Sequence, residues 1–104
     1  MQTSDFIVTR FRRELTAIYG ARRERVVLFG SRARGDAAPD SDYDVAVFLK
    51  DMSDRWSEIG RLPALRFPYL ERDEAFLGVM PYHAEDHNKQ TGLMHSIRTE
   101  EITV

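Results

Sequence analysis

Two carboxylates, Asp42 and Asp44, stand two residues apart at the start of an apolar run in FGSRARGDAAPDSDYDVAVFL, residues 29–49. Side chains two apart on a strand point to the same face, so these carboxylates project together and repel each other. A divalent cation relieves that repulsion directly. Magnesium takes one or two protein carboxylates and completes its shell with water and substrate phosphates. The pair therefore indicates a Mg²⁺ site, with Asp42 and Asp44 as metal ligands and catalytic residues.

The residues just upstream have the properties of a phosphate-binding turn. Gly30 follows a predicted strand and lets a phosphate approach the backbone closely. Ser31 offers a hydroxyl and begins a helical turn, whose free N–H groups favour anions. Arg32 or Arg34 can neutralise phosphate charge, and Gly35 allows a tight exit. We therefore interpret Gly30, Ser31, Arg32 and Arg34 as nucleotide-phosphate ligands.

A phosphate turn beside a metal pair suits nucleotidyl transfer, in which metal ions stabilise the attacking and the leaving oxygen. The simpler alternative is a surface turn followed by an exposed strand start. A Gly-Ser or an Asp-x-Asp alone is a weak signal, whereas their ordered combination between two buried strands is specific. For Arg32 and Arg34, ordinary solvent-exposed arginines remain an alternative.

The predicted elements that must position this site follow from apolar periodicity and from Gly and Pro. An amphipathic helix is predicted at Ser4–Tyr19, with Ser4 as its N-cap, and a buried strand at Arg25–Phe29. A helical turn at Ser31–Asp36 and a loop at Ala37–Ser41 then lead to a second buried strand at Tyr43–Leu49.

The second half is predicted to begin with a helix that is capped by Ser53 or Asp54 and broken by Pro63 and Pro68, because a proline inside a helix costs about 3 kcal/mol. A third strand, Ala75–Met80, should end at Pro81. The last helix should span Thr91–Glu101, with Leu93, Met94 and Ile97 facing inward. The order predicts an α/β (α+β) fold in which helices pack on a small mixed sheet.

Composition limits the remaining possibilities. The 104 residues are 42% hydrophobic, which predicts a single domain spanning residues 1–104. Its small core favours a stable partner or a homodimer. A formal net charge of −2 argues against direct nucleic-acid binding, and the lack of cysteine excludes disulfides and thiolate metal sites. No signal-peptide-like or membrane-spanning run is found, so a cytoplasmic location is expected.

Gly30-Ser31, Gly35 and Asp42-x-Asp44, in this order, resemble the signature of the DNA polymerase β-like nucleotidyltransferase superfamily. The short chain resembles its minimal nucleotidyltransferase branch, small bacterial and archaeal proteins often encoded beside a HEPN-domain partner as a toxin–antitoxin pair. The resemblance is strong from Val26 to Leu49 and continues weakly to the closing LMHSIR.

This resemblance implies the polymerase β-like fold, Mg²⁺, and ATP or another NTP as substrate. It also implies transfer of a nucleoside monophosphate, AMP in the case of ATP, to a hydroxyl. In the antitoxin subgroup the acceptor is a tyrosine of the HEPN-type toxin. A function as the antitoxin of such a pair is therefore expected.

One position departs from the family pattern. Active members usually carry a third carboxylate on the next central strand, and the residue that aligns with it here is Gly78. Asp73 or Glu74 could substitute from a shifted position. Two functions remain open: a Mg²⁺-dependent nucleotidyltransferase, or a degenerate one that neutralises its partner by contact.

Two further groups of residues have simpler explanations. His83 and His87 lie four apart and could form a metal pair, but surface histidines explain them better. Some apolar residues of the proline-rich segment are expected to stay exposed and to mark a binding face; the candidates are Trp56, Leu65, Phe67 and Tyr69.

Overall fold

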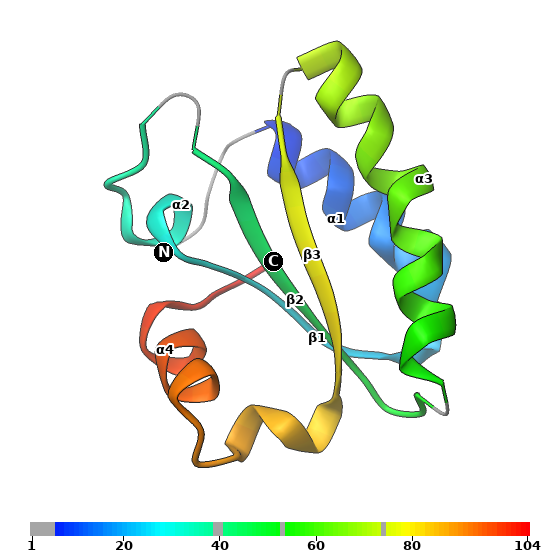
Figure 1. The fold of residues 1–104 in the computed structure, drawn as a ribbon, viewed down its shortest axis with the longest axis vertical. Helices are drawn as coiled ribbons and strands as arrows, with labels where there is room; N and C mark the ends of the chain where they lie inside the picture. Colours follow the sequence, from blue (N-terminus) through cyan, green and yellow to red (C-terminus); the bar gives the residue numbers. More distant parts are fainter. Residues whose placement is uncertain (1–5, 39–40, 53, 74) are drawn as a thin grey trace.

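The computed structural model describes residues 6–38, 41–52, 54–73 and 75–104. Its four-stranded sheet has the order β3-β2-β1-β4. The strands β3, β2 and β1 are labelled in Figure 1. β1 runs antiparallel to β2 and β4, whereas β2 and β3 are parallel. The mixed α/β fold predicted from the sequence is therefore confirmed. The elements are α1 (Phe6–Tyr19), η1 (Gly20–Arg22), β1 (Arg23–Phe29), α2 (Ser31–Arg34), β2 (Tyr43–Leu49), α3 (Arg55–Asp73), β3 (Leu77–His83), η2 (Ala84–Asn88), α4 (Gly92–Glu100) and β4 (Ile102–Thr103).

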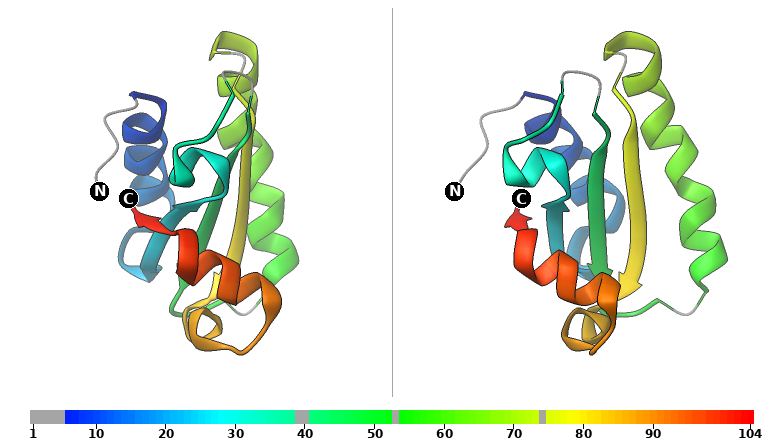
Figure 2. Two further views of the ribbon diagram at one scale, coloured as in Figure 1. Left: turned by 90° about the vertical axis from the view of Figure 1, so that its left-hand side faces the viewer. Right: turned by 60° about the vertical axis from the view of Figure 1, so that its left-hand side comes forward.

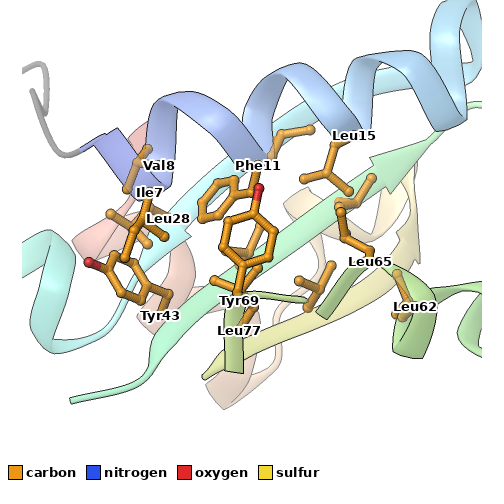
Figure 3. Close-up of a cluster of buried hydrophobic side chains, with 14 of the residues drawn as sticks. Ile7, Val8, Phe11, Leu15, Leu28, Tyr43, Leu62, Leu65, Tyr69 and Leu77 are labelled. Carbon is orange, nitrogen blue, oxygen red and sulfur yellow. The ribbon is translucent and has the colours of Figure 1, made fainter. Parts of the chain in front are cut away.

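Helices cover both faces of the sheet. α1 and α3 pack on one face, where their apolar stripes meet alternate residues of the strands (Figure 3). α4 lies on the other face of the sheet (Figure 2). There Met94 and Ile97 pack against Val27, Ala46 and Phe48. β2 is buried along almost its whole length because it lies between two strands and two helical layers. Asp44 is the half-buried charged residue of this otherwise buried, largely apolar strand.

The predicted break in the third helix is wrong. α3 runs from Arg55 to Asp73 with Pro63 and Pro68 inside it. Pro63 is exposed and Pro68 half-buried. The carbonyls that lose their helical N–H donors belong to Ile59, which is half-buried, and Ala64, which is exposed. The apolar face of α3 packs against the sheet through Leu62, Leu65 and Tyr69. This tertiary packing offsets the helix-breaking cost of the two prolines.

The predicted end of the third strand at Pro81 is also wrong, because β3 continues to His83. β3 lies at one edge of the sheet and pairs only with β2 among the described strands. Proline lacks an N–H donor, and an edge strand tolerates this because one side of its ladder has no partner. β3 also begins at Leu77, two residues later than predicted.

The helix ends differ little from the predictions. α1 begins at Phe6, and its predicted N-cap Ser4 lies outside the described residues, as does Ser53. Asp54 does cap α3, since its Oδ1 accepts N–H donors from Trp56 and Ser57. In the last helix Met94 and Ile97 are buried, but Leu93 is 47% exposed, which corrects its predicted inward orientation.

The short strand β4 was not predicted. Ile102 pairs with Leu28 and Thr103 with Val27, so the chain returns to the sheet directly after α4. Among the described residues no helix is both long and apolar enough to cross a membrane.

Candidate functional site

The turn between β1 and α2 requires a glycine. Gly30 has a φ of 77°, a backbone conformation that side chains disfavour. A Cβ built on Gly30 would also stand 2.3 Å from Asp44 Oδ2, which is far inside contact distance. The two predicted site residues are therefore in direct proximity: Gly30 directly follows β1, and Asp44 lies in the neighbouring strand β2.

The rest of the turn has the structure predicted from the sequence. Ser31 begins α2, a single helical turn that ends at Gly35. Gly35 has a φ of 86° and donates its N–H to the carbonyl of Ser31 at 2.9 Å. The tight exit predicted at Gly35 is therefore present, with a left-handed backbone that suits glycine.

Asp44 lies in the central strand β2, opposite Phe29 of β1 and Gly78 of β3. Its side chain belongs to the α4 face of the sheet. Burial raises the pKa of Asp44 above its ordinary value, and the negative charges of Asp42 and Glu100 raise it further. Arg34 opposes this with a smaller effect in the other direction. Asp44 thus lies in a site that lacks enough positive charge to balance its carboxylates.

The chemistry of this donor pair fits a hard cation. Asp42 immediately precedes β2 and is exposed, and its charge acts on the half-buried Asp44. Two carboxylate ligands are enough for Mg²⁺ when substrate phosphates and water complete the shell. No cluster of three His, Cys, Asp or Glu side chains able to hold a metal occurs among the described residues. The pair therefore fits an ion that is bound jointly with its nucleotide.

Gly78 is the residue that was expected to align with a third carboxylate. It pairs with Asp44 in the parallel ladder, and a Cβ on Gly78 would be 3.5 Å from Asp44 Oδ1. A carboxylate at this position would therefore lie beside Asp44. Whether Asp73 or Glu74 substitutes stays open, because Glu74 and the side chain of Asp73 lie outside the described part of the chain.

The two predicted phosphate-binding arginines lie in different environments. Arg34 Nη1 donates to Glu100 Oε2 at 2.8 Å, and Arg34 Nε donates to Asp36 Oδ2 at 3.2 Å. These hydrogen bonds raise the pKa of Arg34, that to Glu100 having the larger effect. Because Glu100 also acts on Asp44, Arg34 belongs to the same charge cluster as the carboxylate pair.

Arg32 instead holds the loop that leads into β2. Its Nε and Nη2 donate to the carbonyl of Ser41 at 3.2 and 3.0 Å. Its guanidinium also lies 4.3 Å from the centre of the Tyr43 ring, which packs on the α1 side of the sheet. Its phosphate-binding role stays a prediction, and these contacts provide a structural reason for an arginine there.

Glu100, at the end of α4, is a site residue that the sequence reasoning missed. Its Oε1 accepts the backbone N–H of Gly30 at 3.0 Å, and its Oε2 accepts from Arg34. Glu100 lies 70 positions after Gly30 in the sequence, so no local motif joins them. Recognising β4 as the partner of β1 would have brought the two together.

His83 and His87 lie in different environments. His87 is buried, lies 2.7 Å from Glu101 Oε2 and meets the Phe48 ring edge-on. His83 is exposed at the end of β3. The prediction of a surface histidine is right for His83 and wrong for His87, which packs beneath the C-terminal helix.

Comparison with known proteins places the fold and the motif in context. A family model described as "Nucleotidyltransferase domain" matches residues 8–98. The curated "Putative protein adenylyltransferase MJ0141" of Methanocaldococcus jannaschii is 41% identical over 46 residues, which are 44% of this chain and 46% of the relative. The matched segment thus spans about half the length of that relative.

Solved structures share the fold. A toxin–antitoxin with AMP-PNP matches with a TM-score of 0.60 and 20% identity, over 90% of this chain and 69% of the other. A mutant of the toxin–antitoxin MntA-HpeT, with a tyrosine replaced by alanine, matches with a TM-score of 0.59 and 19% identity, over 99% and 72%. A second MntA-HpeT mutant, with two aspartates replaced by glutamate, gives 0.59 and 18%, over 90% and 69%.

The family match covers most of the chain, and the structural matches extend over both of its halves. The motif resemblance that was read from Gly30, Ser31, Asp42 and Asp44 is thereby confirmed at the level of the family. The chain belongs to the nucleotidyltransferase domain family, as its motifs indicated.

Proposed function

We propose that this chain transfers a nucleoside monophosphate, AMP from ATP, to a hydroxyl group in a Mg²⁺-dependent reaction. The observation that carries the proposal is the proximity of Asp44 to the Gly30 turn, where only a glycine leaves room for the carboxylate. A triphosphate held at this turn would lie next to the Asp42–Asp44 pair. The family match and the curated adenylyltransferase relative support the same chemistry.

In this proposal each residue has a limited task. Gly30 and Ser31 hold the phosphates, and Arg34 balances part of their charge. Asp42 and Asp44 would hold Mg²⁺, which when bound stabilises charge on the attacking and leaving oxygens. The acceptor hydroxyl oxygen forms a bond to the α-phosphorus while the bond from that phosphorus to the oxygen bridging to the β-phosphorus breaks. Pyrophosphate leaves, and the hydroxyl proton is released to water. Catalysis rests mainly on orientation and charge neutralisation.

Calorimetric titration of ATP with Mg²⁺ tests the site. The wild type should bind, and the double variant Asp42→Asn, Asp44→Asn should not. Asp51→Asn is the matched control, because this exposed carboxylate follows the far end of β2 and pairs with Arg22 instead. Binding that survives in the double variant would overturn the assignment of the metal pair.

The acceptor that we propose is a tyrosine of a HEPN-type toxin, with this chain as the antitoxin in the cytoplasm. The toxin–antitoxin structures that share the fold support this choice. Incubation of the partner with ATP, Mg²⁺ and the wild-type chain should add one AMP moiety to a tyrosine, as seen by mass spectrometry. The double asparagine variant should add none. An unmodified partner in both reactions would contradict the proposal.

A second candidate function is neutralisation of the partner by contact alone. Gly78 favours it, since the third carboxylate of active relatives is missing beside Asp44. An exposed apolar surface also favours it: Phe67, Leu70 and Phe76 are each about half exposed and line one hollow between α3 and β3. The predicted exposure of the proline-rich segment is right for Phe67 and Trp56, whereas Leu65 and Tyr69 are buried.

One variant distinguishes the two functions. If the chain acts as an enzyme, a folded Asp42→Ala variant that still binds its partner should fail to neutralise it. Full neutralisation by that variant would instead favour the contact mechanism. A homodimer, expected from the small core, can be tested on the same samples by sedimentation.

A further inference from the structure

The Glu100 side chain replaces a backbone hydrogen bond where the pairing between β1 and β4 stops. Leu28 pairs with Ile102 and Val27 with Thr103, so continuation of this antiparallel register would put Gly30 opposite Glu100. Glu100, however, is still the last residue of α4. Its side-chain Oε1 accepts the Gly30 N–H at 3.0 Å, in place of a strand carbonyl. The carboxylate thus satisfies a backbone donor at the end of β1.

The same carboxylate reaches the other end of α2. Glu100 Oε2 accepts from Arg34 Nη1 at 2.8 Å, while Asp36 accepts from Arg34 Nε at 3.2 Å. In the described ranges Arg34 Nη2 has no hydrogen-bond partner. The hydrogen bonds of Nε and Nη1 therefore fix the orientation of the planar Arg34 guanidinium, and with it the direction of the remaining N–H donors. The Glu100 side chain is only 23% exposed, so its two contacts are partly shielded from water.

We propose that Glu100 is a positioning residue of the candidate nucleotide site. It braces the Gly30 turn and orients Arg34 toward the phosphates of the nucleotide. This inference rests on the proposed function and deepens it. Glu100 adds a negative charge where an anionic ligand is to bind, so a carboxylate without a positioning role would weaken binding, and its removal would tighten it. Weaker ATP binding after removal of the Glu100 carboxylate therefore indicates a positioning role, whereas tighter binding indicates simple charge repulsion of the nucleotide.

Measuring ATP affinity in the presence of Mg²⁺ shows whether loss of the Glu100 carboxylate weakens or tightens binding. Glu100→Ala removes both contacts and should weaken binding about tenfold, which corresponds to about 1.4 kcal/mol. Glu100→Gln keeps an oxygen for the Gly30 N–H but loses the charge that holds Arg34, and should weaken binding by a smaller factor. Unchanged or tighter binding in the glutamine variant, which preserves the length of the side chain, overturns the proposal.

Glu101→Gln is the matched control. Glu101 adjoins Glu100 but contacts His87 and Arg25 instead. Its substitution should leave ATP affinity within about twofold of the wild type, because these partners lie outside the candidate site. An equal loss in the Glu100 and Glu101 variants would mean that the whole C-terminal segment is loosened, and would overturn a specific role of Glu100.

A double-mutant cycle shows whether Glu100 acts through Arg34. Arg34→Gln alone should weaken ATP binding. In that background the further change Glu100→Gln should have little effect, because the guanidinium that it orients is gone. Full additivity of the two losses overturns positioning through Arg34, since independent contributions would add.

The bracing itself can be tested without any nucleotide. Amide hydrogen exchange at Gly30 should be slow in the wild type and faster in Glu100→Ala, by more than the change in global stability measured from the urea midpoints explains. Equal exchange in the two proteins overturns the contact. A wild type that binds no ATP but shows this difference would overturn the proposed function and leave the bracing of the turn standing, so the two failures are distinguishable.

Discussion

Gly78 lies directly opposite Asp44 in the parallel ladder between β2 and β3, and a Cβ on Gly78 would be 3.5 Å from Asp44 Oδ1. This is ordinary van der Waals contact, and Gly78 does not have a positive φ. A Cβ can therefore be added at Gly78 without backbone strain. The position expected to align with a third carboxylate has room for the first side-chain atom of one.

Gly78→Asp should create a stronger cation site. Without metal, a third carboxylate beside Asp42 and Asp44 should lower the melting temperature at pH 7 through repulsion. With Mg²⁺ the melting temperature should rise more than in the wild type. A site whose Kd is tenfold below the Mg²⁺ concentration adds about 1.4 kcal/mol of stability. Thermal melts with and without MgCl₂ measure the difference.

The control for this variant is Gly78→Asn, which has nearly the same shape without the charge. It should show no additional Mg²⁺ response. If the aspartate and asparagine variants respond equally to Mg²⁺, position 78 does not contribute to a metal site. Nucleotidyl transfer should increase only in the aspartate variant, provided that the chain acts as an enzyme.

Asp44→Asn should stabilise the fold at neutral pH while it weakens binding of ATP with Mg²⁺. The pKa of Asp44 is raised in the folded state by burial and by the charges of Asp42 and Glu100. The folded protein therefore binds this proton more tightly than the unfolded chain, so stability falls as pH rises from the unfolded to the folded pKa. Above that window the charged Asp44 destabilises the fold.

The expected gain for Asp44→Asn at pH 7 is small because the site is partly solvated, about 2 to 4 °C in melting temperature. It should shrink toward zero as pH falls below the pKa of Asp44, where the wild-type carboxyl is neutral as well. Melting curves from pH 3 to pH 8 test this trend. A gain that is equally large at the acid end would assign the effect to packing rather than to charge.

The local parts of the site could be predicted from the sequence because their signals are local. Gly30 and Gly35 adopt the positive φ angles that their residue type permits, and β2 has the predicted bounds Tyr43–Leu49. The Asp42-x-Asp44 spacing on a buried strand is likewise a short-range pattern. These features depend on residues within about fifteen positions of one another.

The parts that could not be predicted depend on tertiary context. Glu100 reaches Gly30 only because β4 pairs with β1, and a two-residue strand leaves almost no periodic signal. Pro81 is tolerated because β3 is an edge strand, which no local pattern around it reveals. The continuous α3 likewise depends on packing of its buried face, which outweighs the intrinsic preference of its prolines.

Pro63→Ala should stabilise the protein. Pro63 is exposed inside α3, so its replacement restores an N–H donor to the helix without disturbing the core. The gain from helix propensity, about 3 kcal/mol at most, is reduced by up to about 1 kcal/mol because alanine leaves the unfolded chain more flexible. Urea denaturation should show a higher midpoint. A midpoint at or below that of the wild type would mean that α3 is already adapted to a proline at this place.

Gly30→Ala should damage both the fold and the site, because the φ of 77° disfavours a side chain and the new Cβ would collide with Asp44 Oδ2 at 2.3 Å. Strain of this kind costs about 1 to 3 kcal/mol. Gly60→Ala is the matched control: Gly60 lies within α3 with nothing within 4 Å of its added Cβ, so it should gain about 0.5 to 1 kcal/mol. Urea denaturation gives both free energies, and calorimetry should show that ATP binding is lost only in Gly30→Ala. If Gly30→Ala binds ATP as the wild type does, the close approach of this turn to Asp44 is not required for the nucleotide site.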